Sequence, residues 1–421
     1  MKYRKAKITL AIILCIVLLY VAYQYFSWNK MAYNNLPLTR GVESIQFEQP
    51  IQSAEQNLKT IPEKLNVPSV SVAVGVEGQL VWSAAYGYAD LENKIAASPK
   101  TTYRIGSTSK AVTSTALMRL VQSGGLDLDQ EVSQLVKDYP EKAYEFTTRQ
   151  LLSHTAGFPD YEDLGISGAW FTLTNLHQFY SVEEGLKVFK DRPLLFEPDT
   201  EFKYNSFDLV MASRVLEVNS GLSFSEFLQA EVFQPLGMEN IYLDHGGYRS
   251  AEEAEFYQMK PGAYRGWHFF GLPNRNQNLS YKWAGGGIVA SPTDLVKMGN
   301  ALVNDSAFIS FDIRNEFFTP KRLASGEVNE QRYALGWRSY KDHGSAYLLG
   351  EEQKFWMVHH GGVSKGSMNL LLLFPDQQLV VDVAINGRTK DFDFSPFWIE
   401  VMKMTAPFLD QLVLAKKIES E

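Results

Sequence analysis

Hydrophobic and polar positions divide the chain into two strand-rich regions that flank a helical middle. Residues 68–76 and 79–88 form β-rich runs, and Glu77-Gly78 between them is typical of a hairpin turn. Strand patterns return late in the chain, at residues 336–340, 354–359, 367–374 and 378–385. This order predicts an α+β protein in which one sheet domain is interrupted by an insertion.

Helical spacing of apolar residues predicts helices before, within and after the insertion. The helix that starts at Ser107 should stop at Gly124-Gly125, because paired glycines end helices. We expect the insertion to span about residues 126–280 and to be mostly helical. The predicted helices cover residues 49–65, 107–122, 206–218, 223–233 and 396–415.

An uncharged run of 22 residues lies between Lys7 and Lys30 and is most apolar over residues 8–26. At about 1.5 Å per residue it spans a hydrocarbon core of roughly 30 Å. Basic residues precede it, so we expect residues 1–7 in the cytoplasm, residues 8–26 as a transmembrane anchor, and the body on the periplasmic side of the inner membrane. The alternative is a cleaved signal peptide, although no small-x-small pair marks a cleavage site nearby.

Composition narrows the classes of function. The chain has 421 residues, of which 45% are hydrophobic, so it can form a sizeable core. Its net charge of −8 argues against nucleic acid as a partner. The single cysteine, Cys15, lies in the apolar run and excludes an internal disulfide. Histidines are scattered without an H-E-x-x-H pattern, so we expect neither a metal nor another cofactor.

The first chemical candidate is Ser107-Thr-Ser-Lys110 at the start of a predicted helix. Residues at i and i+3 share one helix face, so the hydroxyl and the amine can meet. A serine needs an adjacent base, and a lysine can be that base if burial or neighbouring cations lower its pKa. The pattern is weak alone, because Ser27-Trp-Asn-Lys30 matches it too.

Two further candidates stand later in the chain. Tyr204 precedes Ser206 at a predicted helix start, where a phenol can share proton transfer with the lysine. In His359-His360-Gly361-Gly362, the glycines allow a substrate to approach a strand closely, and a backbone N–H there can stabilise an oxyanion. A competing nucleophile, Ser364, fits G-x-S-x-G, but a strand pattern follows it where a helix is required.

The three candidates together resemble the motifs of the β-lactamase and penicillin-binding protein family, which are S-x-x-K, Y-x-N and K-T-G or H-x-G. The resemblance covers roughly residues 50–410. It implies an antiparallel sheet flanked by helices, with residues 49–415 as the hydrolase domain and residues 27–48 as a linker to the anchor. Further segments similar to the family are Leu151–Gly157, Pro235–Met238 and Ala284–Gly287.

The resemblance also implies a role for each motif residue. Ser107 would form the acyl-enzyme, with Lys110 and Tyr204 as the general base. The backbone N–H groups of Ser107 and Gly362 would form the oxyanion hole. His359 would replace the usual lysine beside the tyrosine, and Ser206 stands where most relatives have asparagine. His360, Gly361 and Ser206 would contact substrate.

These inferences predict a membrane-anchored serine hydrolase, most simply a peptidase acting on peptides. An esterase of the same fold is the first alternative, and weak cleavage of β-lactams is compatible with it. A non-catalytic scaffold that binds partners or forms filaments is the alternative of another class. A homo-oligomer is compatible with each of these functions.

Overall fold

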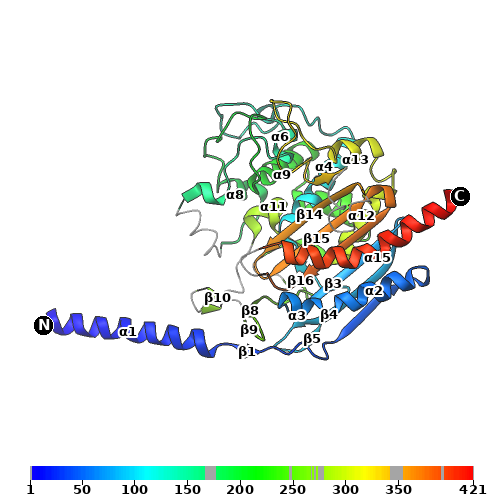
Figure 1. The fold of residues 1–421 in the computed structure, drawn as a ribbon. Helices are drawn as coiled ribbons and strands as arrows, with labels where there is room; N and C mark the ends of the chain where they lie inside the picture. Colours follow the sequence, from blue (N-terminus) through cyan, green and yellow to red (C-terminus); the bar gives the residue numbers. More distant parts are fainter. Residues whose placement is uncertain are drawn as a thin grey trace.

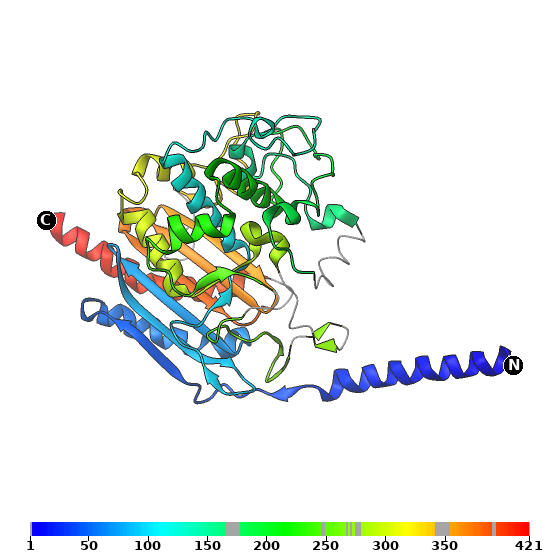
Figure 2. The ribbon, with the colours of Figure 1, turned by 180° about the vertical axis from the view of Figure 1, so that it is seen from behind.

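The computed structural model describes residues 2–165, 177–245, 249–266, 268–269, 272–273, 279–341, 354–389 and 393–420. A central sheet lies between two helical layers, and one long helix projects from the body (Figure 1). Seen from behind, the helices between residues 109 and 304 cover one face of the sheet (Figure 2).

The sheet has eight strands, and every pair in it is antiparallel. Strands from the two ends of the chain meet in its middle, where residues 379–385 pair with residues 70–76. The predicted hairpin turn is present, since Glu77 and Gly78 both have positive φ angles. In spatial order the strands are β13 (Arg338–Tyr340), β14 (Met357–Ser364), β15 (Ser367–Phe374), β16 (Leu379–Ile385), β3 (Ser69–Val76), β4 (Gln79–Asp90) and β2 (Leu38–Glu43), and β5 (Ile95–Ala96) pairs with β4.

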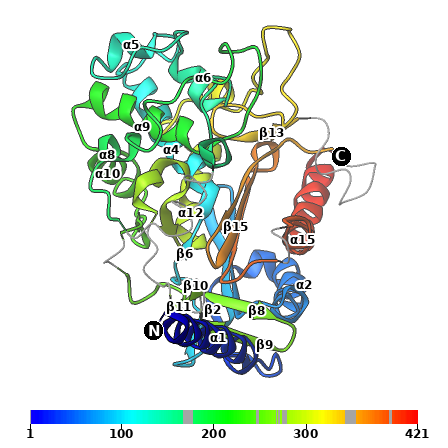
Figure 3. The same cartoon turned by 90° about the vertical axis from the view of Figure 1, so that its left-hand side faces the viewer.

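Helices from the two ends of the chain cover one face of the sheet, and Figure 3 shows two of them, α2 and α15, on the side away from α4. Their apolar residues form one core with alternate residues of the strands, such as Leu370, Leu372 and Val383. These elements are η1 (Ile45–Phe47), α2 (Glu48–Leu58), α3 (Ile61–Leu65), η6 (Pro375–Gln377) and α15 (Ser395–Ser420).

The opposite face carries the larger core, which includes Leu371 and Leu373, the other alternate residues of β15. Its central helices are α4 and α9, and α12 packs on β3 and β16. The helical elements here are η2 (Gly106–Thr108), α4 (Ser109–Gln122), α5 (Val132–Leu135), α6 (Thr148–Leu152), η3 (Tyr161–Leu164), α8 (Val182–Leu186), α9 (Phe207–Ser220), α10 (Phe224–Leu228), η4 (Gln229–Phe233), η5 (Ser280–Lys282), α11 (Trp283–Gly286), α12 (Pro292–Asn304) and α13 (Phe311–Phe317).

Three smaller sheets lie around these layers, and they make the predicted insertion less helical than expected. One joins the start of the chain to the insertion, with the order β1–β9–β8. The first sheet consists of β1 (Asn29–Lys30), β8 (Tyr257–Lys260) and β9 (Ala263–Gly266). The second consists of β6 (Tyr103–Arg104), β12 (Ile288–Ala290) and β7 (Ile241–Leu243), and the third of β10 (His268–Phe269) and β11 (Leu272–Pro273).

The apolar run forms helix α1 (Lys2–Phe26), whose segment Lys7–Phe26 is long and apolar enough to cross a membrane. The predicted linker, residues 27–48, is not a tether in the structure. It supplies β1 and the edge strand β2, and Arg40 forms a two-fold hydrogen bond with Glu55 on α2, at 2.7 Å for each contact. The sequence did not indicate these strands, because polar edge strands lack the apolar pattern of central ones.

Candidate active site

Ser107 lies in the 3-10 turn η2, directly before helix α4, and its side chain is half-buried. The turn packs tightly on β14. Gly106 has a φ of +53°, and a Cβ there would lie 2.6 Å from the carbonyl oxygen of Val363. Glycine therefore lets the turn present the serine against the strand. The N-terminal end of α4 adds a positive potential at this point.

Lys110 is fully buried, and its ammonium group reaches the serine. Its Nζ lies 3.2 Å from Ser107 Oγ, 3.3 Å from Ser206 Oγ and 2.6 Å from the carbonyl oxygen of Gly285. The spacing of S-x-x-K thus brings the two side chains together as predicted. Ser206, which stands in the asparagine position of the family motif, contacts the lysine.

Tyr204 lies beside this pair, in the loop before α9. The Lys110 Nζ is 4.8 Å and the Arg338 Cζ is 5.0 Å from the centre of its ring. Burial raises the pKa of Tyr204, but the charges of Lys110 and Arg338, with hydrogen bonds to Ser107 and Lys110, give a net lowering. A lowered pKa makes the tyrosine easier to ionise, and its phenolate is suited to accept the proton of the neighbouring serine hydroxyl.

A wall of buried polar rings stands behind Tyr204. The ring of His154 lies 4.6 Å from the rings of both Tyr204 and Tyr333, and its Nδ1 lies 2.9 Å from Asp208 Oδ2. Burial lowers the pKa of His154 and raises that of Asp208, each by a large amount, which favours the neutral form of both groups. The wall therefore orients the tyrosines without adding charge.

The structure corrects the predicted position of His359. Neighbouring residues of a strand face opposite sides of the sheet, and His359 faces α15, with its ring 4.9 Å from Trp398. His360 faces the serine side, where its Nε2 lies 2.9 Å from Tyr333 Oη and its ring lies 6.4 Å from that of Tyr204. Burial and the charge of Arg338 lower the pKa values of both histidines, so both are neutral.

The two glycines after the histidines likewise face opposite sides of the sheet. A Cβ on Gly361 would meet the ring of Phe394 on the α15 side, at 2.7 Å. A Cβ on Gly362 would lie 1.8 Å from the carbonyl oxygen of Ile105 and 2.8 Å from the backbone N of Ser107. Gly362 thus lies against the nucleophile turn, whereas Gly361 does not face it. His360 is fully buried, so it lies behind the site surface.

Two cations that the motifs did not indicate lie at the site. Arg338 on β13 has its guanidinium over the rings of Tyr204 and Tyr333, at 5.0 and 5.2 Å. Lys282 lies near the start of α11, 5.0 Å from the Tyr161 ring, and its Nζ is 3.6 Å from the Cβ position of Gly286. Burial and the charge of Lys110 lower the pKa of Lys282 to about 8. Among the described residues, the ammonium of Lys282 contacts the rings of Tyr161 and Tyr281, at 5.0 and 5.7 Å from their centres.

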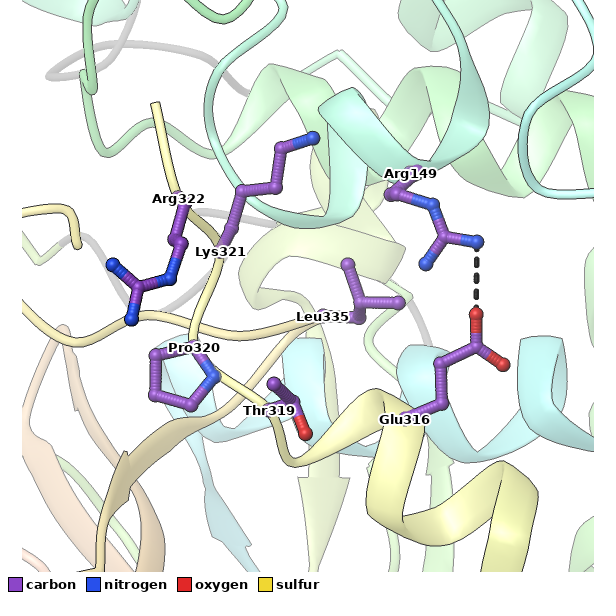
Figure 4. A pocket seen from close by; sticks show the side chains of 7 residues that line it. All are labelled: Arg149, Glu316, Thr319, Pro320, Lys321, Arg322 and Leu335. Atoms are coloured by element: carbon purple, nitrogen blue, oxygen red, sulfur yellow. Dashed lines mark ion pairs between the residues drawn. The ribbon is translucent and has the colours of Figure 1, made fainter. Parts of the chain in front are cut away.

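The other sequence candidates lie elsewhere or are excluded. Ser364 pairs with Ser367 in the β14–β15 hairpin, so the strand–turn–helix of a nucleophile elbow is absent at this position. No cluster of three metal-ligating residues occurs in the part of the chain that the structure describes. A pocket of about 430 Å³ lies away from Ser107 (Figure 4), and its Arg149 forms an ion pair with Glu316 at 2.8 Å.

Comparison with known proteins agrees with this geometry. The sequence profile of the beta-lactamase family matches residues 54–399. The chain belongs to the beta-lactamase family. It is 27% identical to the human mitochondrial serine beta-lactamase-like protein over 79% of this chain and 73% of that protein. It is 24% identical to penicillin-binding protein 4* of Bacillus subtilis, over 82% of this chain and 74% of that protein.

Several solved structures resemble this fold, and their names differ. The hydrolase EstCE1 has a TM-score of 0.69 at 20% identity and covers 86% of this chain and all of its own. A D-amino acid amidase from Ochrobactrum anthropi scores 0.64 at 22% identity, covering 86% and 99%. An octameric penicillin-binding protein homologue from Pyrococcus abyssi scores 0.66 at 24% identity, covering 86% and 77%. The fold is therefore the beta-lactamase and penicillin-binding protein fold that the motifs predicted.

Proposed function

We propose that this beta-lactamase family member is a peptidase that acts through an acyl-enzyme on Ser107. The observation that carries the proposal is the contact of Lys110 Nζ with Ser107 Oγ at 3.2 Å, beside a tyrosine whose pKa is lowered. The charge of Lys110 stabilises the phenolate of Tyr204, which accepts the proton of Ser107 as Oγ attacks the substrate carbonyl carbon. Tyr204 then returns the proton to the leaving amine as the C–N bond breaks.

The tetrahedral oxyanion needs two donors, and we propose the backbone N–H groups of Ser107 and Gly362. The support is the close approach of this part of β14 to the nucleophile turn, where Gly362 has no room for a side chain. In the second half of the reaction the Tyr204 phenolate takes a proton from a water molecule as the water oxygen attacks the acyl carbon. The bond from that carbon to Oγ then breaks, and Tyr204 returns the proton to Ser107 Oγ.

The cations of the site support a peptide substrate over a neutral ester. Arg338 is a permanent charge beside Tyr204, on the edge strand β13, and guanidinium groups bind carboxylates with two parallel hydrogen bonds. We assign to it the free carboxylate of the leaving amino acid. Lys282, whose ammonium has no ion pair among the described residues and lies near Gly286, suits a carboxylate on the acyl side.

The nucleophile is tested with the full chain in detergent micelles and a fluorophosphonate probe, followed by peptide mapping. We expect one adduct on Ser107 and none in Ser107→Ala. In Lys110→Met the rate of labelling should fall by about 10²-fold or more. Ser364→Ala is the matched control and should label normally. A folded protein that labels at Ser364, or not at all, would contradict the mechanism and favour the scaffold alternative.

The peptidase assignment is tested by comparing substrates that share one acyl group. We expect a peptide with a free terminal carboxylate to be cleaved with a higher kcat/KM than its C-terminal amide, and Arg338→Gln to remove most of that difference. Equal values for the two peptides, together with faster cleavage of simple esters, would assign the chain as an esterase instead.

We further propose that α1 anchors the enzyme in the inner membrane, with the catalytic domain on the periplasmic side. The support is the apolar length of Lys7–Phe26 and the basic residues before it. Alkaline carbonate should leave the full chain in the membrane fraction, and protease should reach the catalytic domain only from the periplasmic side. Release by carbonate would contradict the anchor.

A further inference from the structure

The end of the apolar helix is built into the folded domain rather than tethered to it. Strand β1 pairs with β9, with Asn29 opposite Tyr264 and Lys30 opposite Ala263. The backbone N of Met31 donates to the carbonyl oxygen of Gly262 at 2.9 Å. The chain that leaves α1 therefore continues directly into a three-stranded sheet with the β8–β9 hairpin (Figure 1).

Arg265 on β9 holds the last turn of α1 in place. Its Nη1 donates to Gln24 Oε1 at 2.9 Å and to Ser27 Oγ at 3.2 Å, and its Nε donates to Gln258 Oε1 at 2.6 Å. The guanidinium also lies over the ring of Trp28, at 4.5 Å. Arg265 is only 9% exposed, so these contacts are largely shielded from water. A flexible linker would not order such a group.

The hairpin rests on a buried apolar cluster of its own, formed by Met31, Leu36, Leu91 and Tyr257. Tyr257 Oη donates to Asp90 Oδ1 at 3.1 Å, so the base of the hairpin is joined to β4 of the main sheet. The orientation of α1 relative to the catalytic domain is thus fixed through the hairpin.

The surface beside this junction has the composition of a membrane interface. The apolar run of α1 ends at Phe26, which is 87% exposed, and Trp28 follows it. The ammonium of Lys260 lies 4.2 Å from the Trp28 ring, and the side chains of Lys30 and Lys260 are exposed. Residues 27–30 and 257–266 carry Lys30, Lys260 and Arg265 and no acid, whereas the whole chain carries −8. Aromatic rings and lysines at the end of a span are typical of the headgroup layer.

We propose that the β8–β9 hairpin and residues 27–30 form a foot that rests on the bilayer surface, where Lys30 and Lys260 contact the phosphates of anionic phospholipids. The inference rests on the proposed anchor, since α1 must lie in the membrane for the foot to reach it. Each exposed lysine near an anionic surface adds to the electrostatic attraction. The foot fixes both the height and the tilt of the catalytic domain above the membrane.

The test uses the full chain in lipid nanodiscs, with Cys15→Ala as background and one spin label at Pro261→Cys in the hairpin turn. The matched control is Ser133→Cys on α5, which Figure 3 shows at the far end of the molecule from α1. In discs containing phosphatidylglycerol, we expect the label at 261 to be immobile and to lose most of its accessibility to a water-soluble nickel chelate. The label at 133 should stay fully accessible.

Two variants test separately the two parts of the proposal, which are the fixed hairpin and its contact with lipid. Arg265→Gln should make the label at 261 mobile, and the double variant Lys30→Gln with Lys260→Gln should restore nickel accessibility while the label stays ordered. An accessibility at 261 equal to that at 133, or one unchanged between phosphatidylglycerol and pure phosphatidylcholine discs, would overturn the foot. A chain that carbonate extracts from the membrane would instead overturn the anchor.

Discussion

Arg338 controls the proton affinity of Tyr204, because its guanidinium lies 5.0 Å from the centre of that ring. The charge lowers the pKa of the tyrosine, so Arg338→Gln should raise it. If Tyr204 must be deprotonated to act, the acid limb of kcat/KM then moves to higher pH by roughly one unit. The measurement is the pH profile for a neutral ester, which has no carboxylate for Arg338 to bind.

Arg322→Gln is the control for this prediction. Arg322 is an exposed arginine that donates to the carbonyl oxygen of Gly326, and its loss should leave the profile unchanged. An Arg338→Gln profile with an unmoved acid limb would show that Tyr204 is not the group whose ionisation limits the reaction.

Asp208 should stabilise the fold as a neutral acid. Burial raises its pKa in the folded protein, so the folded state holds a proton that the unfolded state releases above about pH 4. This stabilisation is present at low pH and is lost as pH rises through the folded pKa. Asp208→Asn should therefore stay within about 1 kcal/mol of the parent at low pH and lose less stability than the parent as the pH rises above about 4.

The comparison variant is Asp208→Leu, which leaves His154 and Asn205 without their partner. It should cost about 2–4 kcal/mol in urea unfolding at pH 7. His154 is present in every variant, so its protonation in the unfolded state cancels when the variants are compared at one pH. A charged Asp208 would be indicated if Asp208→Asn were as unstable as the leucine variant.

At the scale of residues, the sequence identified those site residues whose spacing along the chain brings their side chains together. Ser107 and Lys110 are one helical turn apart, so local structure alone joins them. His359 was assigned to the wrong face, because two adjacent histidines give a strand no marker of its register. Arg338 and Lys282 reach the site through tertiary packing, and neither belongs to a motif.

At the scale of elements, we expect that Gly362, where β14 contacts the nucleophile turn, cannot be replaced by a residue with a side chain. Gly362→Ala would place a Cβ 1.8 Å from the carbonyl oxygen of Ile105, so the strand must move away from Ser107. We expect a loss of kcat of about 10²-fold or more, because the donors at the oxyanion move with the strand. Steady-state kinetics with a thermal melt would separate this loss from unfolding.

Gly361→Ala is the matched substitution on the other face of the same strand. Its Cβ meets the far edge of the Phe394 ring, which can rotate away, so activity should fall much less. Equal losses in the two variants would show that β14 acts through general stability rather than through its distance from Ser107.

Helices and strands were predictable where they are strongly buried and their apolar pattern is long. Residues 367–374 were predicted as a strand and form β15 with the same limits, since every position is buried between two helical layers. The helix predicted at 107–122 appears as η2 and α4. Strand β2 was missed, because its last four residues, from Arg40 to Glu43, are exposed.

For the whole molecule, the segment between anchor and sheet should be part of the stable unit. Strand β2 covers the edge of β4, and Arg40 pairs with Glu55. A chain that begins at residue 45 should therefore melt at a lower temperature than one that begins at residue 28, by several degrees for a loss of about 1–3 kcal/mol. Identical melting temperatures would show that residues 28–44 add no stability and act only as a tether.

The pairing of β3 with β16 also sets when this protein can fold during its synthesis. Residues 70–76 have no partner on one side until residues 379–385 have been made and delivered. Most of the chain must wait with an open sheet edge, and such edges aggregate. The last strand to be synthesised completes the centre of the sheet, so a chain truncated before it would be a substrate for proteases rather than a smaller enzyme.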